Sequence, residues 1–295
     1  MLLARGGACF GGKPMSLVSR GAALSTDKLG CLARTPFALW KRRRSTLMQR
    51  VVTLYLVAIA GVEISVARGA VVPGIVCDAF LILLLLNHYM LLKPTSNRQA
   101  LPVIALLPLL RIISVTVTFR EAPTIYWYVL TGLPVLAAAI ITARALDFTW
   151  GDLGLRFQYR PLQGIIALTG LPLSLVAYAL VHPKPIFASF TAQHLIAAAV
   201  ILFVFVGLTE EFLFRGLLLR VTSSLFGRLA IVWNAAAFAS LYAGSLSLPF
   251  IGFMGLVGLL FAWSARRTGS IWGVVLAHSA LIVGMTCIWP FVLPR

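Results

Sequence analysis

Acidic side chains are scarce in this chain, which has eight Asp and Glu against 25 Lys and Arg among its 295 residues. Charged residues make up 11% of the total, hydrophobic residues 60%, and the mean hydropathy is +0.96. Such values exclude a water-soluble globular domain. The four cysteines, Cys9, Cys31, Cys77 and Cys287, have neither the spacing of a metal site nor a plausible disulfide grouping. The composition predicts an integral membrane protein.

Long apolar runs are abundant instead. A membrane-spanning helix needs about 20 mostly apolar residues. The sequence offers such runs near 51–67, 71–92, 101–119, 125–143, 163–181, 191–214, 229–245, 249–265 and 271–292. The predicted fold class is therefore an all-α polytopic transmembrane bundle with eight or nine spans.

The net charge of +17 could indicate nucleic acid binding, but the basic residues lie between the apolar runs, where membrane orientation explains them. With a cytoplasmic N-terminus, the outer segments hold only Arg68, Arg120, Lys184 and Arg295. We therefore expect a cytoplasmic N-terminus, the lipid bilayer as the surroundings and no nucleic acid partner. The cell (inner) membrane is the expected location, and an organelle membrane stays open.

Residues 1–47 are basic, contain one acidic residue, Asp27, and lack a long apolar period. We expect them to be a disordered N-terminal extension, which is a basic arm on an anionic membrane face, an organelle transit peptide or a leader upstream of a start at Met48. The remainder divides at its longest polar break, 144–161, into front helices at 50–143 and a core at 150–292. In the front spans, Glu63, Asp78, His88 and Arg111 are the exceptional polar residues, and the expected role is pairing within the bundle or a place at a helix end.

The stretch LTEEFLFRG places Glu210 and Glu211 at the end of an apolar run. A charged residue at the centre of a span costs about 2.5 to 3.5 kcal/mol on insertion scales. Glu211 and Arg215 are four residues apart in the favourable order for a helical ion pair. Glu210 has no partner in its own turn, so its partner must come from another helix or from water. A buried carboxylate with access to water is what a general base requires.

His278 lies in the last apolar run, about 15 Å along its helix from the basic end near Arg267, and Glu210 is about 15 Å from Arg220 by the same helical rise. The matching depths favour proximity of His278 and Glu210. Tyr242 shares a helical face with Asn234 and Phe238. It is either a hydrogen-bond donor within the bundle or an interfacial aromatic.

These residues resemble the CPBP family (CAAX-processing and bacteriocin-processing, also called Abi or Rce1-like) of intramembrane proteases. EEFLFR at 210–215 is similar to the family's EExxxR motif, and RRTGSIWGVVLAH resembles the segment that ends in a motif histidine. WGDLGLR at 150–156 resembles the entry into the family's core. The resemblance implies a glutamate-dependent endopeptidase acting on a membrane protein or peptide. It also implies that Glu210 activates water while Glu211 and Arg215 shape the site.

Two positions depart from the family pattern. The motif FxxxH reads FASLY here, so Tyr242 replaces a histidine, and HxxxN reads HSALI, so Ile282 replaces a polar partner. Tyr242 can donate a hydrogen bond to an oxyanion, whereas Ile282 cannot. His278 is expected to orient or polarise. No cofactor is expected, and a divalent metal stays open, although an HExxH pattern is missing.

Two other functions stay open at this stage. One is a catalytically degenerate pseudoprotease that acts in membrane binding, immunity or scaffolding. The other is a transporter or channel in which the acidic pair is a cation or proton site.

Overall fold

The computed structural model describes residues 36–117 and 124–293, and they form helices and turns with no strand. Residues 43–295 make up one compact unit. The predicted N-terminal extension lies outside the described range up to residue 35. Helix α1 begins at Pro36, so the boundary expected at residue 47 falls inside a helix.

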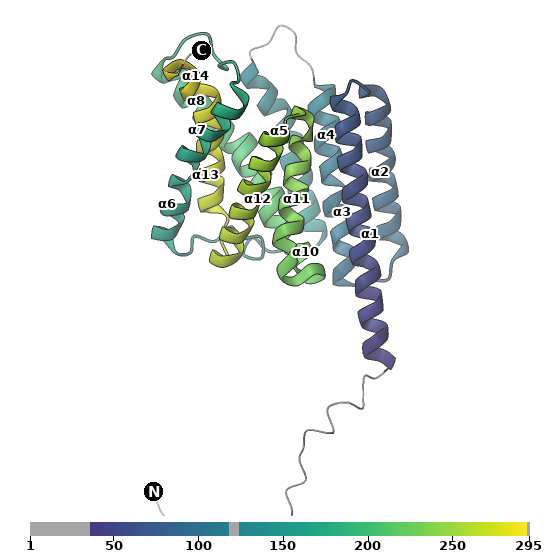
Figure 1. The fold of residues 1–295 in the computed structure, drawn as a ribbon. Helices are drawn as coiled ribbons and strands as arrows, with labels where there is room; N and C mark the ends of the chain where they lie inside the picture. The colour runs from purple at the N-terminus through teal and green to yellow at the C-terminus, as the bar shows by residue number, and fades with distance from the viewer. Residues whose placement is uncertain (1–35, 118–123, 294–295) are drawn as a thin grey trace, which may run out of the picture. The chain divides into compact units, whose positions relative to one another are not determined.

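The front part of the unit contains α1 to α5 (Figure 1). Its elements are α1 (Pro36–Ala67), α2 (Val71–Leu91), the short 3₁₀ helix η2 (Ser96–Gln99), α3 (Ala100–Ile104), α4 (Leu106–Thr116) and α5 (Thr124–Ala145). Apolar runs of this length fold as helices in a membrane because a helix satisfies its backbone groups internally. Helix α4 packs against both α2 and α5.

The remaining elements follow a connection at residues 146–159. They are α6 (Arg160–Leu168), α7 (Gly170–Val181), α8 (Ala192–Leu202), the π-helix η3 (Phe203–Leu208), α9 (Thr209–Glu211), the π-helix η4 (Phe212–Leu218), α10 (Leu219–Phe226), η5 (Gly227–Leu229), α11 (Ala230–Leu241), η6 (Tyr242–Ser245), α12 (Leu248–Thr268), α13 (Trp272–Val283), the π-helix η7 (Gly284–Ile288) and α14 (Trp289–Val292).

Eight segments of the described chain are long and apolar enough to cross a membrane. The sixth, Ala192–Ser245, has 54 residues, more than twice the length that one crossing needs. It turns at Gly227, whose φ of 58° and ψ of −118° suit glycine, and α10 then packs against α11. This segment covers two of the predicted runs, 191–214 and 229–245. The all-α polytopic bundle is confirmed, and the protein is an integral membrane protein.

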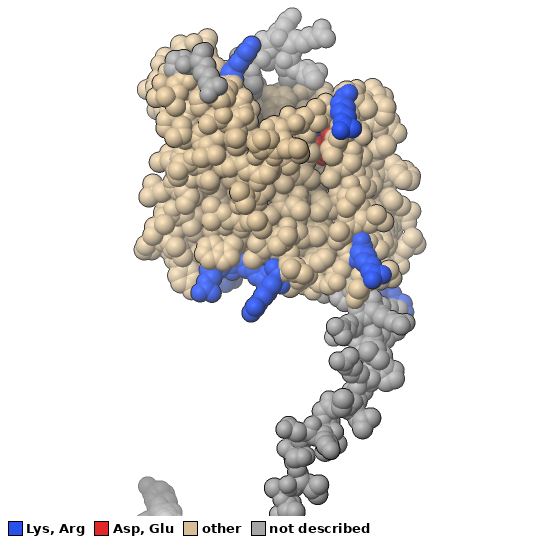
Figure 2. Space-filling view, in the orientation of Figure 1, with Lys and Arg blue, Asp and Glu red and all other residues tan. Residues whose placement is uncertain are grey.

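Helix α13 lies at the centre of the back part, where it contacts α6, α7 and η3. Its candidate span, Trp272–Val292, is 67% buried, compared with 22% for the span of α5. Helix α5 also packs against η3 and η4, so front and back helices share one core. The Lys and Arg side chains visible in Figure 2 lie mostly along the lower edge, beneath a broad band of uncharged residues.

Candidate active site

The two adjacent glutamates lie in a helix that changes its winding around them. Helix α9, Thr209–Glu211, is one short α-helical turn between the π-helices η3 and η4. π turns leave backbone carbonyls to be satisfied by other groups, and they are frequent at functional sites. Here Thr209 Oγ1 donates to Val204 O at 3.0 Å, and Asn234 Nδ2 on α11 donates to Phe214 O at 2.8 Å. Asn234 thus ties the glutamate helix to α11.

Glu211 and Arg215 form the ion pair that their spacing predicts. Arg215 Nη1 lies 2.9 Å from Glu211 Oε1, and both side chains are 0% exposed. The guanidinium carbon of Arg215 is 4.2 Å from the centroid of the Phe238 ring, close enough for a cation–π contact. Arg215 Nη2 also donates to Gly258 O at 3.4 Å. The pair is therefore fixed by α12 as well as by the aromatic residue of α11.

His278 approaches the same carboxylate from α13. Its Nδ1 lies 2.8 Å from Glu211 Oε1, and the ring is fully buried. A carboxylate only accepts hydrogen bonds, so Nδ1 carries the proton and donates. In the neutral ring, Nε2 then presents a lone pair. Glu211 thus sets both the orientation and the tautomer of His278, and the matching depths inferred from the sequence are consistent with this contact.

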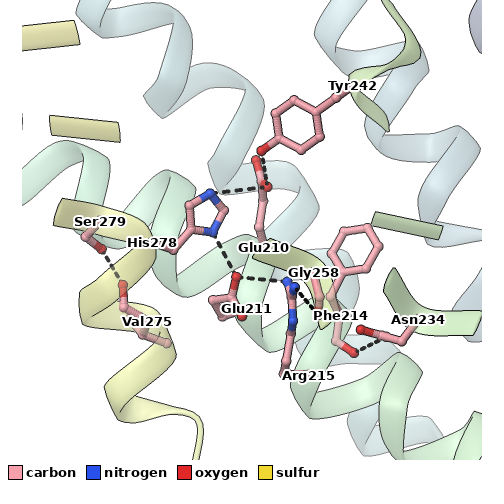
Figure 3. Close-up of polar contacts among 10 residues, drawn as sticks. All are labelled: Glu210, Glu211, Phe214, Arg215, Asn234, Tyr242, Gly258, Val275, His278 and Ser279. Atoms are coloured by element: carbon pink, nitrogen blue, oxygen red, sulfur yellow. Dashed lines mark hydrogen bonds and ion pairs between the residues drawn. The ribbon is translucent and has the colours of Figure 1, made fainter. Parts of the chain in front are cut away.

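Glu210 differs from its neighbours in exposure. Its side chain is 21% exposed, whereas the side chains of Glu211, Arg215 and His278 are 0% exposed. The Tyr242 hydroxyl donates to Glu210 Oε2 at 3.4 Å. His278 Nε2 lies 3.8 Å from the same oxygen and has no hydrogen-bond partner in the described structure. Figure 3 shows the Glu210 carboxylate between Tyr242 and His278, above the pair formed by Glu211 and Arg215.

The gap between Glu210 and His278 suits a bridging water. Two acceptors do not hydrogen-bond each other, but at a separation of 3.8 Å one water can lie about 2.8 Å from both. Such a water donates one proton to Oε2 and one to Nε2. Its remaining lone pairs then point away from both groups. This arrangement orients a nucleophile beside a base.

The structure therefore brings together all five residues singled out in the sequence: Glu210, Glu211, Arg215, Tyr242 and His278 (Figure 3). The comparison with known proteins agrees with their pattern. Residues 191–283 match the model of the family described as type II CAAX prenyl endopeptidase Rce1-like. This segment belongs to the CPBP family. No curated protein and no solved structure matches the chain.

The CPBP segment holds its five site residues on two helical stretches and one short turn. Glu210, Glu211 and Arg215 come from α9 and η4, and His278 comes from α13. Tyr242 is the first residue of η6, directly after α11. Its contact with Glu210 favours the hydrogen-bonding alternative over the interfacial one. Ile282, at the second departure from the CPBP pattern, is 7% exposed and belongs to the hydrophobic core.

Close approach of two helices holds the CPBP site together, and the sequence motifs do not show it. A Cβ added at Gly207 in η3 would overlap the Ser279 hydroxyl on α13 and would lie 3.0 Å from Val275 O. Ser279 Oγ donates to Val275 O at 2.7 Å within its own helix. Gly207 lies three residues before Glu210, and Ser279 follows His278. A glycine and a serine next to the motif residues are the only sequence signal of this contact.

Three of the four exceptional polar residues of the front helices have polar partners in those helices. Arg111 Nη2 lies 2.8 Å from Glu63 Oε2, and the Tyr55 hydroxyl is 3.2 Å from His88 Nδ1. Asp78 is 2% exposed. The expected pairing within the bundle is confirmed for Glu63, His88 and Arg111. Among the described residues, no group of three His, Cys, Asp or Glu side chains that could hold a metal was found.

Proposed function

We propose that the CPBP segment is a membrane-embedded endopeptidase of the CAAX-protease type, in which Glu210 activates the water that attacks a peptide bond. One observation carries this proposal: within the buried cluster, Glu210 is the member whose side chain is 21% exposed. A general base must reach both water and substrate. The proposed substrate is a membrane protein or peptide, either prenylated or not.

The proposed reaction follows from the contacts. Glu210 removes a proton from the bridging water as the water oxygen bonds to the carbonyl carbon of the substrate. The carbonyl oxygen becomes negative, and the Tyr242 hydroxyl can turn from Glu210 to donate to it. Glu210 then gives its proton to the nitrogen as the C–N bond breaks. The products are a carboxylic acid and an amine, and the atoms balance without a further reactant.

Glu211 and Arg215 have a supporting role in this mechanism. Glu211 Oε1 accepts from both Arg215 and His278, so it holds His278 Nε2 toward the water. Holding the water in a fixed position beside Glu210 removes much of the entropy cost of the reaction. The chemistry as proposed uses protein side chains alone.

The test is cleavage by the purified protein in proteoliposomes. Candidate membrane peptides are added, and new N-termini are labelled and identified by mass spectrometry. Glu210→Gln keeps the size of the side chain but cannot take a proton, so we expect cleavage to fall about 10²- to 10⁴-fold. Glu63→Gln, a matched change of a buried carboxylate in the front helices, should retain cleavage. Equal cleavage by wild type and Glu210→Gln would refute the proposed base.

A second candidate is a pseudoprotease that binds a membrane partner, and the two departures from the family pattern favour it. Tyr242 is a poor base near neutral pH, and Ile282 has no polar group. In a pseudoprotease of this kind, the Tyr242 hydroxyl, 3.4 Å from Glu210, donates its hydrogen bond to the carboxylate oxygen that a catalytic water would otherwise use. The double substitution Tyr242→His with Ile282→Asn separates the two candidates. Cleavage that occurs only in this double variant favours the pseudoprotease, and cleavage by the wild type favours the enzyme.

We also propose that the N-terminus is cytoplasmic, with the bilayer as the surroundings and no nucleic acid partner. The concentration of Lys and Arg along one edge of the unit supports this orientation (Figure 2). Protease protection of an N-terminal tag in oriented vesicles tests it. A tag that is cleaved only from the non-cytoplasmic side would refute the orientation.

A further inference from the structure

A polar cavity lies at the basic end of the bundle, and Arg215 is one of its lining residues. Its volume is about 310 Å³, within the range of small-ligand sites. The connection between α5 and α6 forms one wall with residues 151–154, and the ends of α10 and α12 form others. Gly154 O accepts a hydrogen bond from Ile271 N at 2.9 Å, which fixes this connection against the start of α13. The cavity is thus built from segments far apart in the sequence.

Positive charge predominates in the lining. Arg215, Arg220 and Arg266 line the cavity, and Asp152 is its single acidic residue. Asp152 Oδ1 pairs with Arg220 at 3.3 Å, while Arg266 donates to the carbonyl of Gly227 and has no acidic partner in the described structure. The cavity therefore keeps an excess positive charge.

Two arginines of the lining have side chains that solvent reaches. The Arg220 side chain is 52% exposed, and Arg266 is exposed as well, whereas the Arg215 side chain is 0% exposed. Arg220 and Arg266 are therefore the cations that a ligand in the cavity can reach. The first turn of α13 adds its own positive dipole at Ile271. Ser223 and Ser270 are the remaining polar side chains among the lining residues.

We propose that this cavity binds a phosphate group, from the headgroup of an anionic lipid or from free phosphate. Arginine side chains and the positive end of a helix are the groups that bind phosphate in proteins. The cavity lies at the end of the apolar run that finishes near Arg220, where lipid headgroups meet a membrane protein. Basic pockets between transmembrane helices on the cytoplasmic side bind such headgroups.

Native mass spectrometry of the detergent-solubilised protein tests the proposal without an activity assay. Phosphatidylglycerol and phosphatidylcholine are added separately, and their bound fractions are compared. We expect Arg220→Gln and Arg266→Gln each to weaken phosphatidylglycerol binding about tenfold. Arg267→Gln is the matched control, since Arg267 is adjacent, exposed and outside the cavity lining. Circular dichroism confirms that each variant is folded.

The outcomes separate the possible sources. Displacement of phosphatidylglycerol by inorganic phosphate supports a site that accepts the free anion, and binding that resists phosphate supports the lipid headgroup as the source. An equal loss in Arg266→Gln and Arg267→Gln would overturn the proposal, because it would reflect surface charge alone. Equal binding of phosphatidylcholine and phosphatidylglycerol would also overturn it.

Discussion

Substitution of Gly207 by alanine tests whether contact between the helices that carry Glu210 and His278 sets the geometry of the site. A methyl group at residue 207 would overlap Ser279 Oγ and lie 3.0 Å from Val275 O and 3.2 Å from Ser279 Cβ. The last two distances are shorter than ordinary contact, and both partners are on a helix that is packed on several sides. Overpacking of this kind typically costs about 1 to 3 kcal/mol. We expect Gly207→Ala to lower the free energy of unfolding by this amount.

The assay is denaturant unfolding in detergent, followed by tryptophan fluorescence. Ser279→Ala in the same chain removes the oxygen that the new methyl group would overlap, so the double variant should regain most of the lost stability. The coupling energy expected for residues in contact is about 0.5 to 3 kcal/mol. Gly252→Ala is the matched control, because no atom lies within 4 Å of a Cβ there. Equal losses in Gly207→Ala and in the double variant would refute the reasoning.

Further predictions concern the supports of the site and its surroundings. Glu211→Gln should lower the free energy of unfolding by about 3 to 5 kcal/mol, because it leaves Arg215 buried without its counter-charge; an unchanged denaturant midpoint would contradict this. Asn234→Ala should cost about 1 to 3 kcal/mol in the same assay, because the Phe214 carbonyl loses its partner. Cleavage, once a substrate is found, should be unchanged by a metal chelator, and a loss that added zinc restores would contradict the proposed metal-free mechanism. Hydrogen bonds from Thr149, with a smaller contribution from nearby Arg220, hold the pKa of Asp152 below its ordinary value, so its stabilising effect is present above about pH 4 and is lost as the pH falls through the lowered pKa. Thr149→Val should therefore reduce the loss of stability on acidification, and an identical pH profile would count against this contact.

The helical spacing in the sequence was sufficient to predict the central ion pair. Glu211 and Arg215 are close in sequence, and a local rule fixes their distance. The approach of His278 to Glu211 needed a second argument, the equal depth of two helices in the membrane. That argument predicted proximity to Glu210, whereas the shorter contact is with Glu211, 2.8 Å compared with 3.8 Å. A depth estimate has an error of about one turn, so it cannot tell adjacent residues apart.

The π-helices around α9 could not be predicted from periodicity. Both η3 and η4 consist of residues that fit an ordinary apolar helix. Their widened turns depend on partners elsewhere, such as Asn234 on α11, which is 20 residues from the carbonyl that it satisfies. The polar cavity was missed for a similar reason, since its arginines come from different helices and their common orientation is a tertiary property.

The roles proposed for the two glutamates rest on how many hydrogen-bond donors each one faces. Glu211 accepts from Arg215 and His278, and these two donors occupy its Oε1. Glu210 accepts only the long 3.4 Å bond from Tyr242 among the described residues, so its carboxylate can still accept a hydrogen bond from water. The order of the two residues in the chain does not determine this difference. It arises because α13 and η4 place both strong donors on the side of Glu211. Glu211 could replace Glu210 as the proposed base only if a helix moved. We therefore expect that Glu211→Gln does not transfer the proposed base function to another residue.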